Sequence, residues 1–200
     1  MRIVTAQELE SWLASGTILE KDARGPKVVA LDSGLLLKIF HTRRHPVLAR
    51  LQPAAKRFTH NAKALLSIGI AAPAVSEYFW LDLQAGLSAC IYQPLPGHSI
   101  EQLYRQSPEK MHSLLPALAS FIRQLHLRGI YFRSLHLGNI LLLPDGNYGL
   151  IDILDMRFKG HSLNPRLVQR NFQHLRRYLE RHKLADFQLE ELIAQYRDAP

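Results

Sequence analysis

Residues 131–155 read YFRSLHLGNILLLPDGNYGLIDILD and decide the fold. Two short apolar runs, NILLL and YGLIDIL, flank a Pro-Asp-Gly-Asn sequence that is typical of a turn. Apolar runs separated in this way predict two paired β-strands. Two polar side chains frame the pair, with Asn139 at the start of the first run and Asp152 inside the second.

Both polar side chains suit a bound metal ion. Asn139 falls in a loop ahead of an apolar strand, where an amide oxygen can ligate a hard cation such as Mg²⁺, although asparagine is also a common turn residue. Asp152 follows three strand residues that read as buried, so its charge requires a cationic partner or a metal. Asp155 is expected to cap the next segment or to pair with Arg157.

The N-terminal half of the chain predicts an antiparallel sheet. Three strand-like runs lie between residues 17 and 40, namely TILEK, KVVAL and LLLKIF, and a helix is predicted over 53–67. Two more strands are expected, PAVSEYFWLDL at 73–83 and SACIYQPL at 88–95. Because hairpins rather than crossovers connect these runs, the fold class is α+β rather than a doubly wound parallel sheet.

The C-terminal half is mainly helical. Pro116 is expected to kink the first helix or to mark its first turn. A joint at 93–97 separates an N-lobe over residues 1–96, with a sheet and one helix, from a short C-lobe over residues 97–200. Apolar residues at helical spacing predict three C-lobe helices, over about 114–129, 164–183 and 187–196.

Composition and the distribution of charge indicate where the protein is located and what it can bind. The 200 residues are 47% hydrophobic and carry a net charge of +8. No run approaches the roughly 18 apolar residues of a membrane span, and the N-terminus lacks a signal sequence, so a soluble cytoplasmic protein is expected. No acidic residue lies between Asp32 and Glu77, and a second basic zone covers 157–183. Each zone is either a solvated surface or a docking face for polyanions.

One lysine interrupts the apolar run LLLKIF. Lys38 is costly to bury within a strand unless its ammonium meets an anion. The alternative is an alternating strand on which Lys38 faces solvent.

The order of these features resembles a known signature. A strand lysine, a helix, an H-R-D-x-x-x-x-N loop and a later metal-binding aspartate characterise protein-kinase-like phosphotransferases. Here those positions hold Lys38, Phe132-Arg133-Ser134, Asn139 and Asp152. The sequence LHLGNILL, followed by LIDILDMRF, is similar to sequences of the lipopolysaccharide kinase family, which includes Kdo and heptose kinases. It also resembles small Pseudomonas-type members labelled toluene tolerance proteins.

The resemblance covers roughly residues 17–183 and implies a compact bilobal kinase-like fold that uses ATP and Mg²⁺. Lys38 would bind the α- and β-phosphates, and Asn139 and Asp152 would hold Mg²⁺. Adenine would pack against a hinge over 92–97 that begins with Tyr92. His136 matches a family histidine that is mainly structural, with a role as substitute base as the alternative.

Three positions depart from the family pattern. The turn expected to cover the phosphates has a single glycine, so Arg24 and Lys27 are its candidates for phosphate contact. Asn61 stands about where a glutamate would pair with the strand lysine, and an amide supplies no charge. Ser134 replaces the aspartate that accepts the substrate proton, and loss of such a base typically costs about 10²–10⁴ in rate.

Two functions therefore compete. One is an ATP-dependent and Mg²⁺-dependent kinase acting on a sugar hydroxyl of the lipopolysaccharide core or on another small anionic acceptor. Such a protein could bind an anionic glycolipid or lie at the inner face of a membrane. The other is a pseudokinase that binds nucleotide or a partner with little transfer. Nucleic-acid binding through the arginines of the last long helix is a weaker alternative, because no nucleic-acid motif accompanies them.

Overall fold

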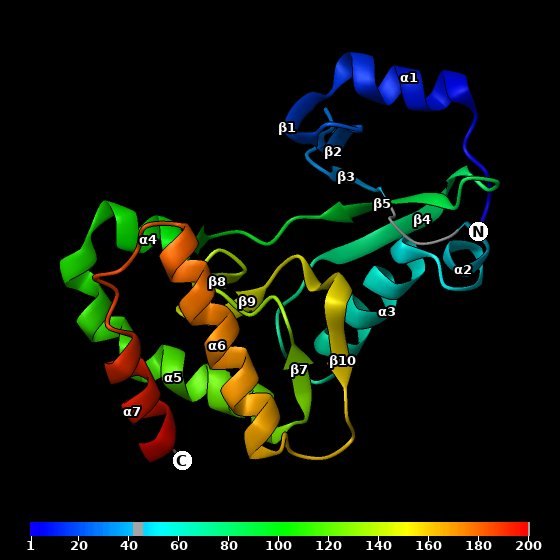
Figure 1. Cartoon of the computed structure of the whole chain (residues 1–200). Helices are drawn as coiled ribbons and strands as arrows, with labels where there is room; N and C mark the ends of the chain where they lie inside the picture. Colours follow the sequence, from blue (N-terminus) through cyan, green and yellow to red (C-terminus); the bar gives the residue numbers. More distant parts are fainter. Residues whose placement is uncertain (42–45, 200) are drawn as a thin grey trace. The chain divides into compact units, whose positions relative to one another are not determined.

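The computed structural model describes residues 1–41 and 46–199. The chain divides into two compact units, Met1–Leu95 and Pro96–Pro200 (Figure 1). Of the basic residues noted between Asp32 and Glu77, Arg43 and Arg44 fall outside the described residues. Within the described ranges, no helix has both the length and the apolar character needed to cross a bilayer.

The first unit is built on a five-stranded sheet. Its strands follow the order β1-β2-β3-β5-β4, and each neighbouring pair is antiparallel, which confirms the α+β prediction. The lysine-bearing strand β3 is central. The strand bounds are β1 (Thr17–Asp22), β2 (Gly25–Ala30), β3 (Leu36–Phe40), β4 (Ala74–Asp82) and β5 (Leu87–Gln93).

Alternation along β3 separates the two faces of this sheet. Leu37 and Ile39 belong to the buried cluster on which side chains of α1 (Ala6–Ser15) pack. The opposite face holds α3 (Ala54–Ser67), whose Phe58 ring lies 5.5 Å from that of Phe40. Because side chains of a strand alternate between faces, Lys38 projects with Phe40 toward α3.

The prediction of a single helix in this half was wrong. Besides α3, the structure contains α1 and a short α2 (Pro46–Leu51). Thr5 caps α1 by accepting a hydrogen bond from the Glu8 amide, and Leu9 and Trp12 lie against the sheet. Thr-x-x-Glu ahead of apolar residues at helical spacing is a helix start that the sequence did contain.

The second unit combines short strands with four α-helices among its described residues. The three-stranded sheet has the order β6-β8-β9, and β7 pairs with β10. The predicted hairpin and the three predicted helices are present; β6, β7, β10 and α4 were not predicted. The elements are β6 (His98–Ser99), α4 (Ile100–Gln106), η1 (Pro108–Lys110), α5 (Met111–Leu127), β7 (Ile130–Phe132), β8 (Ile140–Leu142), β9 (Tyr148–Leu150), η2 (Ile153–Asp155), β10 (Met156–Phe158), α6 (Pro165–Arg181) and α7 (Leu189–Asp198).

Two local expectations in this unit need correction. The second strand of the hairpin ends at Leu150 rather than running on to Leu154, because Asp152 adopts a left-handed backbone with φ 51° and ψ 40° and the 3-10 turn η2 follows. Pro116 lies inside α5, beyond the first turn that was one of its two expected positions. Its missing amide hydrogen removes one hydrogen bond from that helix.

A buried amide connects the helices of the second unit to β7. The Asn171 side chain, 1% exposed, donates from Nδ2 to the Phe132 carbonyl at 2.7 Å. Its Oδ1 lies 3.1 Å from His126 Nε2, and His126 Nδ1 lies 2.9 Å from the Tyr196 hydroxyl. Burial lowers the pKa of His126 to about 4, so the imidazole is neutral at pH 7. Residues of α5, α6, α7 and β7 thus share one hydrogen-bonded chain.

The neutral state of His126 predicts acid sensitivity. Unfolding returns this side chain to a pKa near 6.5, so between pH 6.5 and 4 the unfolded chain binds a proton that the folded chain does not. We expect His126 to lower the free energy of unfolding by about 2 kcal/mol between pH 8 and pH 5. Urea denaturation across this range measures the slope.

His126→Gln supplies the comparison for this measurement. Its unfolding free energy should depend less steeply on pH between 6.5 and 5 than that of the unmodified protein, whatever its absolute stability. An equal slope in both proteins would contradict a buried neutral imidazole.

Candidate functional site

The residues that were predicted to bind metal lie in one loop and hairpin of the second unit. The loop leaves β7 after Phe132 and turns twice, with Leu135 N donating to the Phe132 carbonyl at 3.1 Å and Asn139 N to the His136 carbonyl at 2.9 Å. Strand β8 then pairs with β9, placing Ile140 opposite Leu150. A short turn-rich loop held between two strand pairs can fix side-chain directions closely.

The Asn139 amide has a defined orientation. Its nitrogen lies 3.0 Å from the Ser134 carbonyl oxygen and 3.2 Å from His136 Nε2. A carbonyl can only accept a hydrogen bond, so the atom facing it must be the NH₂ group. Asn139 is 7% exposed, and its Oδ1 is turned away from both of these contacts. That oxygen is the atom a hard cation would require.

Asp152 is placed beside Asn139 by the hairpin ladder. Ile151 N donates to the Asn139 carbonyl at 3.1 Å, and Asp152 is the next residue. The strand before it is buried, as expected, but Asp152 itself is exposed, so its charge does not need a partner to offset burial. Asn139 and Asp152 together offer the oxygen ligands that Mg²⁺ takes from proteins alongside phosphate and water. Among the described residues, no three His, Cys, Asp or Glu side chains form a further metal cluster.

Ser134 contacts a carboxylate. Its hydroxyl donates to Asp155 Oδ2 at 2.5 Å, and Arg133 Nε reaches the same oxygen at 3.1 Å. The pairing partner of Asp155 is thus Arg133 on the loop, and the expectation of a pair with Arg157 was wrong. The reason is the ladder in which Phe132 lies opposite Met156, which brings the start of the loop to the end of η2.

His136 is a half-buried neutral ring. Burial lowers its pKa to about 4, with Asp152 acting in the opposite direction. The ring stacks on Tyr178 of α6 with centroids 3.8 Å apart and an interplanar angle of 8°. Neutral imidazole leaves Nε2 able to accept from Asn139, so His136 helps to orient the proposed metal ligand.

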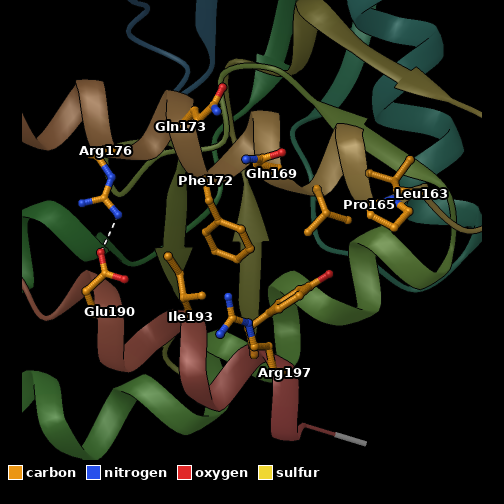
Figure 2. Close-up of a pocket in the computed structure, with 11 residues that line it drawn as sticks. Leu163, Pro165, Gln169, Phe172, Gln173, Arg176, Glu190, Ile193 and Arg197 are labelled. Atoms are coloured by element: carbon orange, nitrogen blue, oxygen red, sulfur yellow. Dashed lines mark hydrogen bonds and ion pairs between the residues drawn. The ribbon is translucent and has the colours of Figure 1, made fainter.

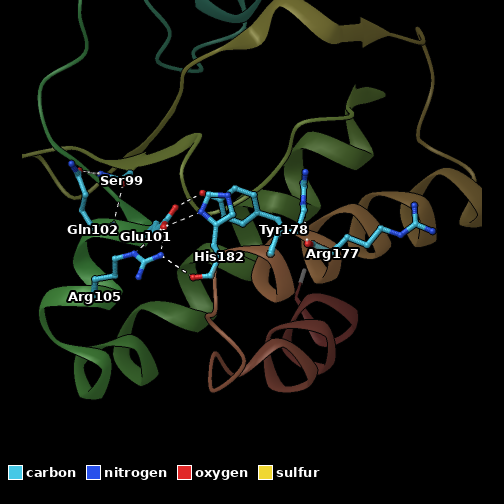
Figure 3. A network of polar contacts seen from close by, with 8 residues as sticks. Ser99, Glu101, Gln102, Arg105, Arg177, Tyr178 and His182 are labelled. Atoms are coloured by element: carbon cyan, nitrogen blue, oxygen red, sulfur yellow. Dashed lines mark hydrogen bonds and ion pairs between the residues drawn. The ribbon is translucent and has the colours of Figure 1, made fainter. Parts of the chain in front are cut away.

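Glu101 of α4 joins a network with Arg105, Tyr178 and His182, as Figure 3 shows, and its backbone also contacts the loop. Its carboxylate accepts hydrogen bonds from the Tyr178 hydroxyl and from Arg105, the latter at 2.7 Å, and its backbone amide donates to the Leu137 carbonyl at 3.1 Å. His182 Nδ1 lies 3.4 Å from Glu101 Oε1. Burial acts to raise the pKa of Glu101, but the hydrogen bonds outweigh it and hold that pKa below its ordinary value. Sequence patterns gave no sign of this network.

Gly138 lies where this network leaves no space. A Cβ on Gly138 would stand 2.6 Å from the Tyr178 hydroxyl, 3.2 Å from Glu101 Oε2 and 3.3 Å from His136 Nδ1. The glycine of the LHLGN sequence is thus required by the packing of the loop against α4 and α6.

The first unit holds the residues that were predicted to bind nucleotide. Lys38 is half-buried, and its Nζ lies 5.9 Å above the Phe58 ring centroid, within cation–π range. Asn61 is 6% exposed and follows Phe58 by one helical turn on α3. The Tyr92 ring also packs on Phe58, at 5.8 Å. Lys38 therefore does not project freely into solvent, which was its alternative placement.

Arg24 and Lys27 belong to the β1–β2 hairpin. Arg24 lies in the turn, where its amide donates to Asp22 Oδ1 at 2.8 Å and its guanidinium to the His41 carbonyl at 3.2 Å. Lys27 forms an ion pair with Glu20 across the two strands. Both cations thus already have a partner, Arg24 in His41 after β3 and Lys27 in Glu20 of β1.

Helix α6 is amphipathic. Asn171, Leu175, Tyr178 and Leu179 are buried, whereas its arginines are exposed. Near the Ser134–Asp155 contact, burial and then the charges of Arg170, Arg177 and Arg133 lower the pKa of His174, while Asp155 opposes them. Arg133, Arg170 and Arg177 thus lie close enough to His174 for their charges to act on it.

A separate groove of about 730 Å³ opens between α6 and α7 (Figure 2). Phe172 and Ile193 line its apolar interior, and an Arg176–Glu190 ion pair crosses one end. None of the predicted site residues lines this groove.

The order of the candidate site residues along the chain indicates the class of protein. A strand lysine in an antiparallel sheet, an Arg-Asp-x-x-x-x-Asn loop and a later metal-binding aspartate characterise protein-kinase-like proteins, and this chain has the same order with Ser134 in place of the loop aspartate. The sequence profile of the lipopolysaccharide kinase (Kdo/WaaP) family matches residues 50–196. The chain belongs to this family, and kinases of this kind bind nucleotide. No curated protein matches the chain. Lys38, Arg24 and Lys27 precede the matched residues.

The close packing around Gly138 predicts that a side chain at this position destabilises the protein. Gly138→Ala should lower the free energy of unfolding by about 1–3 kcal/mol, because a stacked tyrosine must move to admit the methyl group. Urea denaturation of the two proteins measures the difference. Gln173→Ala, at an exposed position of α6, serves as control and should change stability by less than about 0.5 kcal/mol. Equal stability of Gly138→Ala and the unmodified protein would contradict the packing described.

Proposed function

We propose that this protein transfers the γ-phosphoryl group of ATP to a hydroxyl of a compact anionic acceptor, with Mg²⁺ bound by Asn139 and Asp152. The observation that carries the proposal is the fixed orientation of the Asn139 amide. Two acceptors hold its nitrogen, at 3.0 and 3.2 Å, and its oxygen is left for a cation. Ile151 N donates to the Asn139 carbonyl, and the next residue, Asp152, supplies the second ligand through its carboxylate.

The roles of the remaining residues follow from this proposal. Bound Mg²⁺ would neutralise charge on the phosphates, which is the main requirement of phosphoryl transfer. Lys38, together with Asn61 of α3, is proposed to contact the α- and β-phosphates, and Tyr92 to lie in the adenine hinge. Arg24 and Lys27 are secondary candidates for phosphate contact, because the guanidinium of Arg24 already donates to the His41 carbonyl and Lys27 already pairs with Glu20.

Positive charge around the loop favours an anionic acceptor. Arg133, Arg170 and Arg177 all act on His174, which lies beside Asp155. A sugar hydroxyl of the lipopolysaccharide core, carried on an anionic glycolipid, fits this surface and the family. Such an acceptor would bring the cytoplasmic protein to the inner face of a membrane. The likeness to small toluene tolerance proteins is part of the same proposal.

A pseudokinase is the second candidate. The observation that favours it is Ser134, a hydroxyl at the position of the catalytic base. In that case the protein would bind nucleotide or a partner without transfer.

Thermal unfolding with Mg²⁺ and ATP tests the proposed binding site. A ligand at 100 times its Kd stabilises the folded state by about 2.7 kcal/mol, so saturating Mg-ATP should raise the Tm by several degrees. Asp152→Asn should remove the part of this shift that depends on Mg²⁺, and Lys38→Ala should reduce the whole shift. Asp198→Asn, at the exposed end of α7, removes one carboxylate elsewhere and should leave the shift unchanged.

The outcomes separate the candidates. A Tm that does not respond to ATP in the unmodified protein contradicts nucleotide binding. A shift without release of ADP from Mg-ATP supports the pseudokinase. A shift that persists in Asp152→Asn contradicts the assignment of the metal ligand.

A further inference from the structure

The contact between Ser134 and Asp155 brings a carboxylate to the position that lacks one. Ser134 occupies the place of the catalytic aspartate, and its Oγ lies 2.5 Å from Asp155 Oδ2. This separation falls in the range of charge-assisted O–H···O⁻ hydrogen bonds. In such a bond the hydroxyl is the donor, so the Ser134 proton already points at the carboxylate.

The surroundings hold Asp155 in place. Its side chain is 20% exposed, and Arg133 Nε donates to the same Oδ2 at 3.1 Å. The other oxygen, Oδ1, is buried, and among the described residues it has no hydrogen-bond partner. The charge of Asp155 is therefore balanced by one guanidinium, and the oxygen that faces Ser134 is the one that carries both hydrogen bonds.

Backbone pairing makes this contact part of the fold. Phe132 lies opposite Met156 in the β7–β10 ladder, so the residues next to them, Arg133 and Asp155, lie at the same end of that ladder. Asn171 bonds the Phe132 carbonyl from the other side. The Ser134–Asp155 distance is thus set by two strands and a buried amide rather than by flexible side chains alone.

We infer, on the basis of the proposed function, that Ser134 and Asp155 together replace the missing base. Ser134 is the group that touches the acceptor hydroxyl, and Asp155 acts through it as a positioning and proton-accepting residue. The acceptor proton passes to Ser134 Oγ as the Ser134 proton passes to Asp155. The acceptor oxygen forms a bond to the γ-phosphorus of ATP, the bond from that phosphorus to the β–γ bridging oxygen breaks, and ADP keeps the electron pair.

The hydrogen bond from Ser134 to Asp155 explains how a serine can stand in for the missing basic aspartate. A serine hydroxyl cannot retain an acceptor proton at neutral pH, but it can pass its own proton on while accepting another. A purely structural role is the competing explanation, in which Asp155 only ties η2 to the loop. The two explanations differ on whether the charge of Asp155 or merely its hydrogen-bond acceptor is required.

Asp155→Asn separates these explanations, because asparagine keeps an acceptor oxygen and loses the base. With Mg-ATP and water as the acceptor, we expect the kcat for ADP release to fall about 10²–10³-fold while the KM for ATP stays within about twofold. The Tm shift caused by Mg-ATP should persist. Asp198→Asn is the matched control and should hydrolyse ATP at the unmodified rate.

Restoring the carboxylate at position 134 is the decisive variant. Ser134→Asp combined with Asp155→Asn moves the base to the position it occupies in other kinase-like proteins, and the kcat should return to within about tenfold of the unmodified protein. A merely structural loss in Asp155→Asn would not be rescued by this second change.

Nucleotide-free protein provides an independent measurement. Ser134→Ala and Asp155→Ala should each lower the Tm, and the double variant should lower it by clearly less than the sum, because both changes remove one shared hydrogen bond. Additive losses would show that the contact does not form in solution and would overturn the inference.

The activity outcomes distinguish this inference from the function on which it rests. If the unmodified protein releases ADP and Asp155→Asn does so equally fast, the Ser134–Asp155 inference fails and the proposed kinase stands. If the unmodified protein binds Mg-ATP without releasing ADP, both fail and the pseudokinase is favoured.

Discussion

The buried side chain of Asn171 is the constraint on which the second unit depends. Its amide is satisfied at both ends, by the Phe132 carbonyl at 2.7 Å and by His126 at 3.1 Å. Phe132 is the last residue before the loop that carries Ser134 and Asn139, so the start of that loop is fixed to α6 and α5. Removing the amide would leave the buried Nε2 of His126 without its partner, which typically costs about 1–3 kcal/mol, and would take one of two donors from the Phe132 carbonyl. Packing and site geometry therefore share one interaction.

Much of the fold could be predicted because its signals are local. The strands of the first unit and the predicted helices show their own apolar patterns, and Gly69 and Gly129 mark the ends of α3 and α5. The elements that sequence reasoning missed have weak periods of their own. No residue of α1 is fully buried, and β6, β7 and β10 have two or three residues each and exist only because a distant strand pairs with them. Pairing of that kind leaves no local pattern.

In the candidate site, too, local sequence patterns identified some residues and could not identify others. Asn139 and Asp152 stood out because their spacing around a hairpin is local, and the ladder accounts for their proximity. The partners of Ser134 and of Gly138 could not be found in this way. Asp155 is 21 residues from Ser134, and Tyr178 is 77 residues from Glu101. A hydrogen bond over such a separation depends on tertiary structure, so a sequence pattern identifies the polar residue without identifying what it meets.

The left-handed backbone of Asp152 has a consequence for ligand affinity. A non-glycine residue with φ of 51° is strained by roughly 1 kcal/mol or more, although aspartate tolerates this region better than most residues. The hairpin ladder and η2 fix the residues on either side of Asp152, so the fold itself holds that conformation. The conformational cost is met during folding, and none of it is subtracted from the binding free energy of a cation. Asp152 is, in this sense, preorganised.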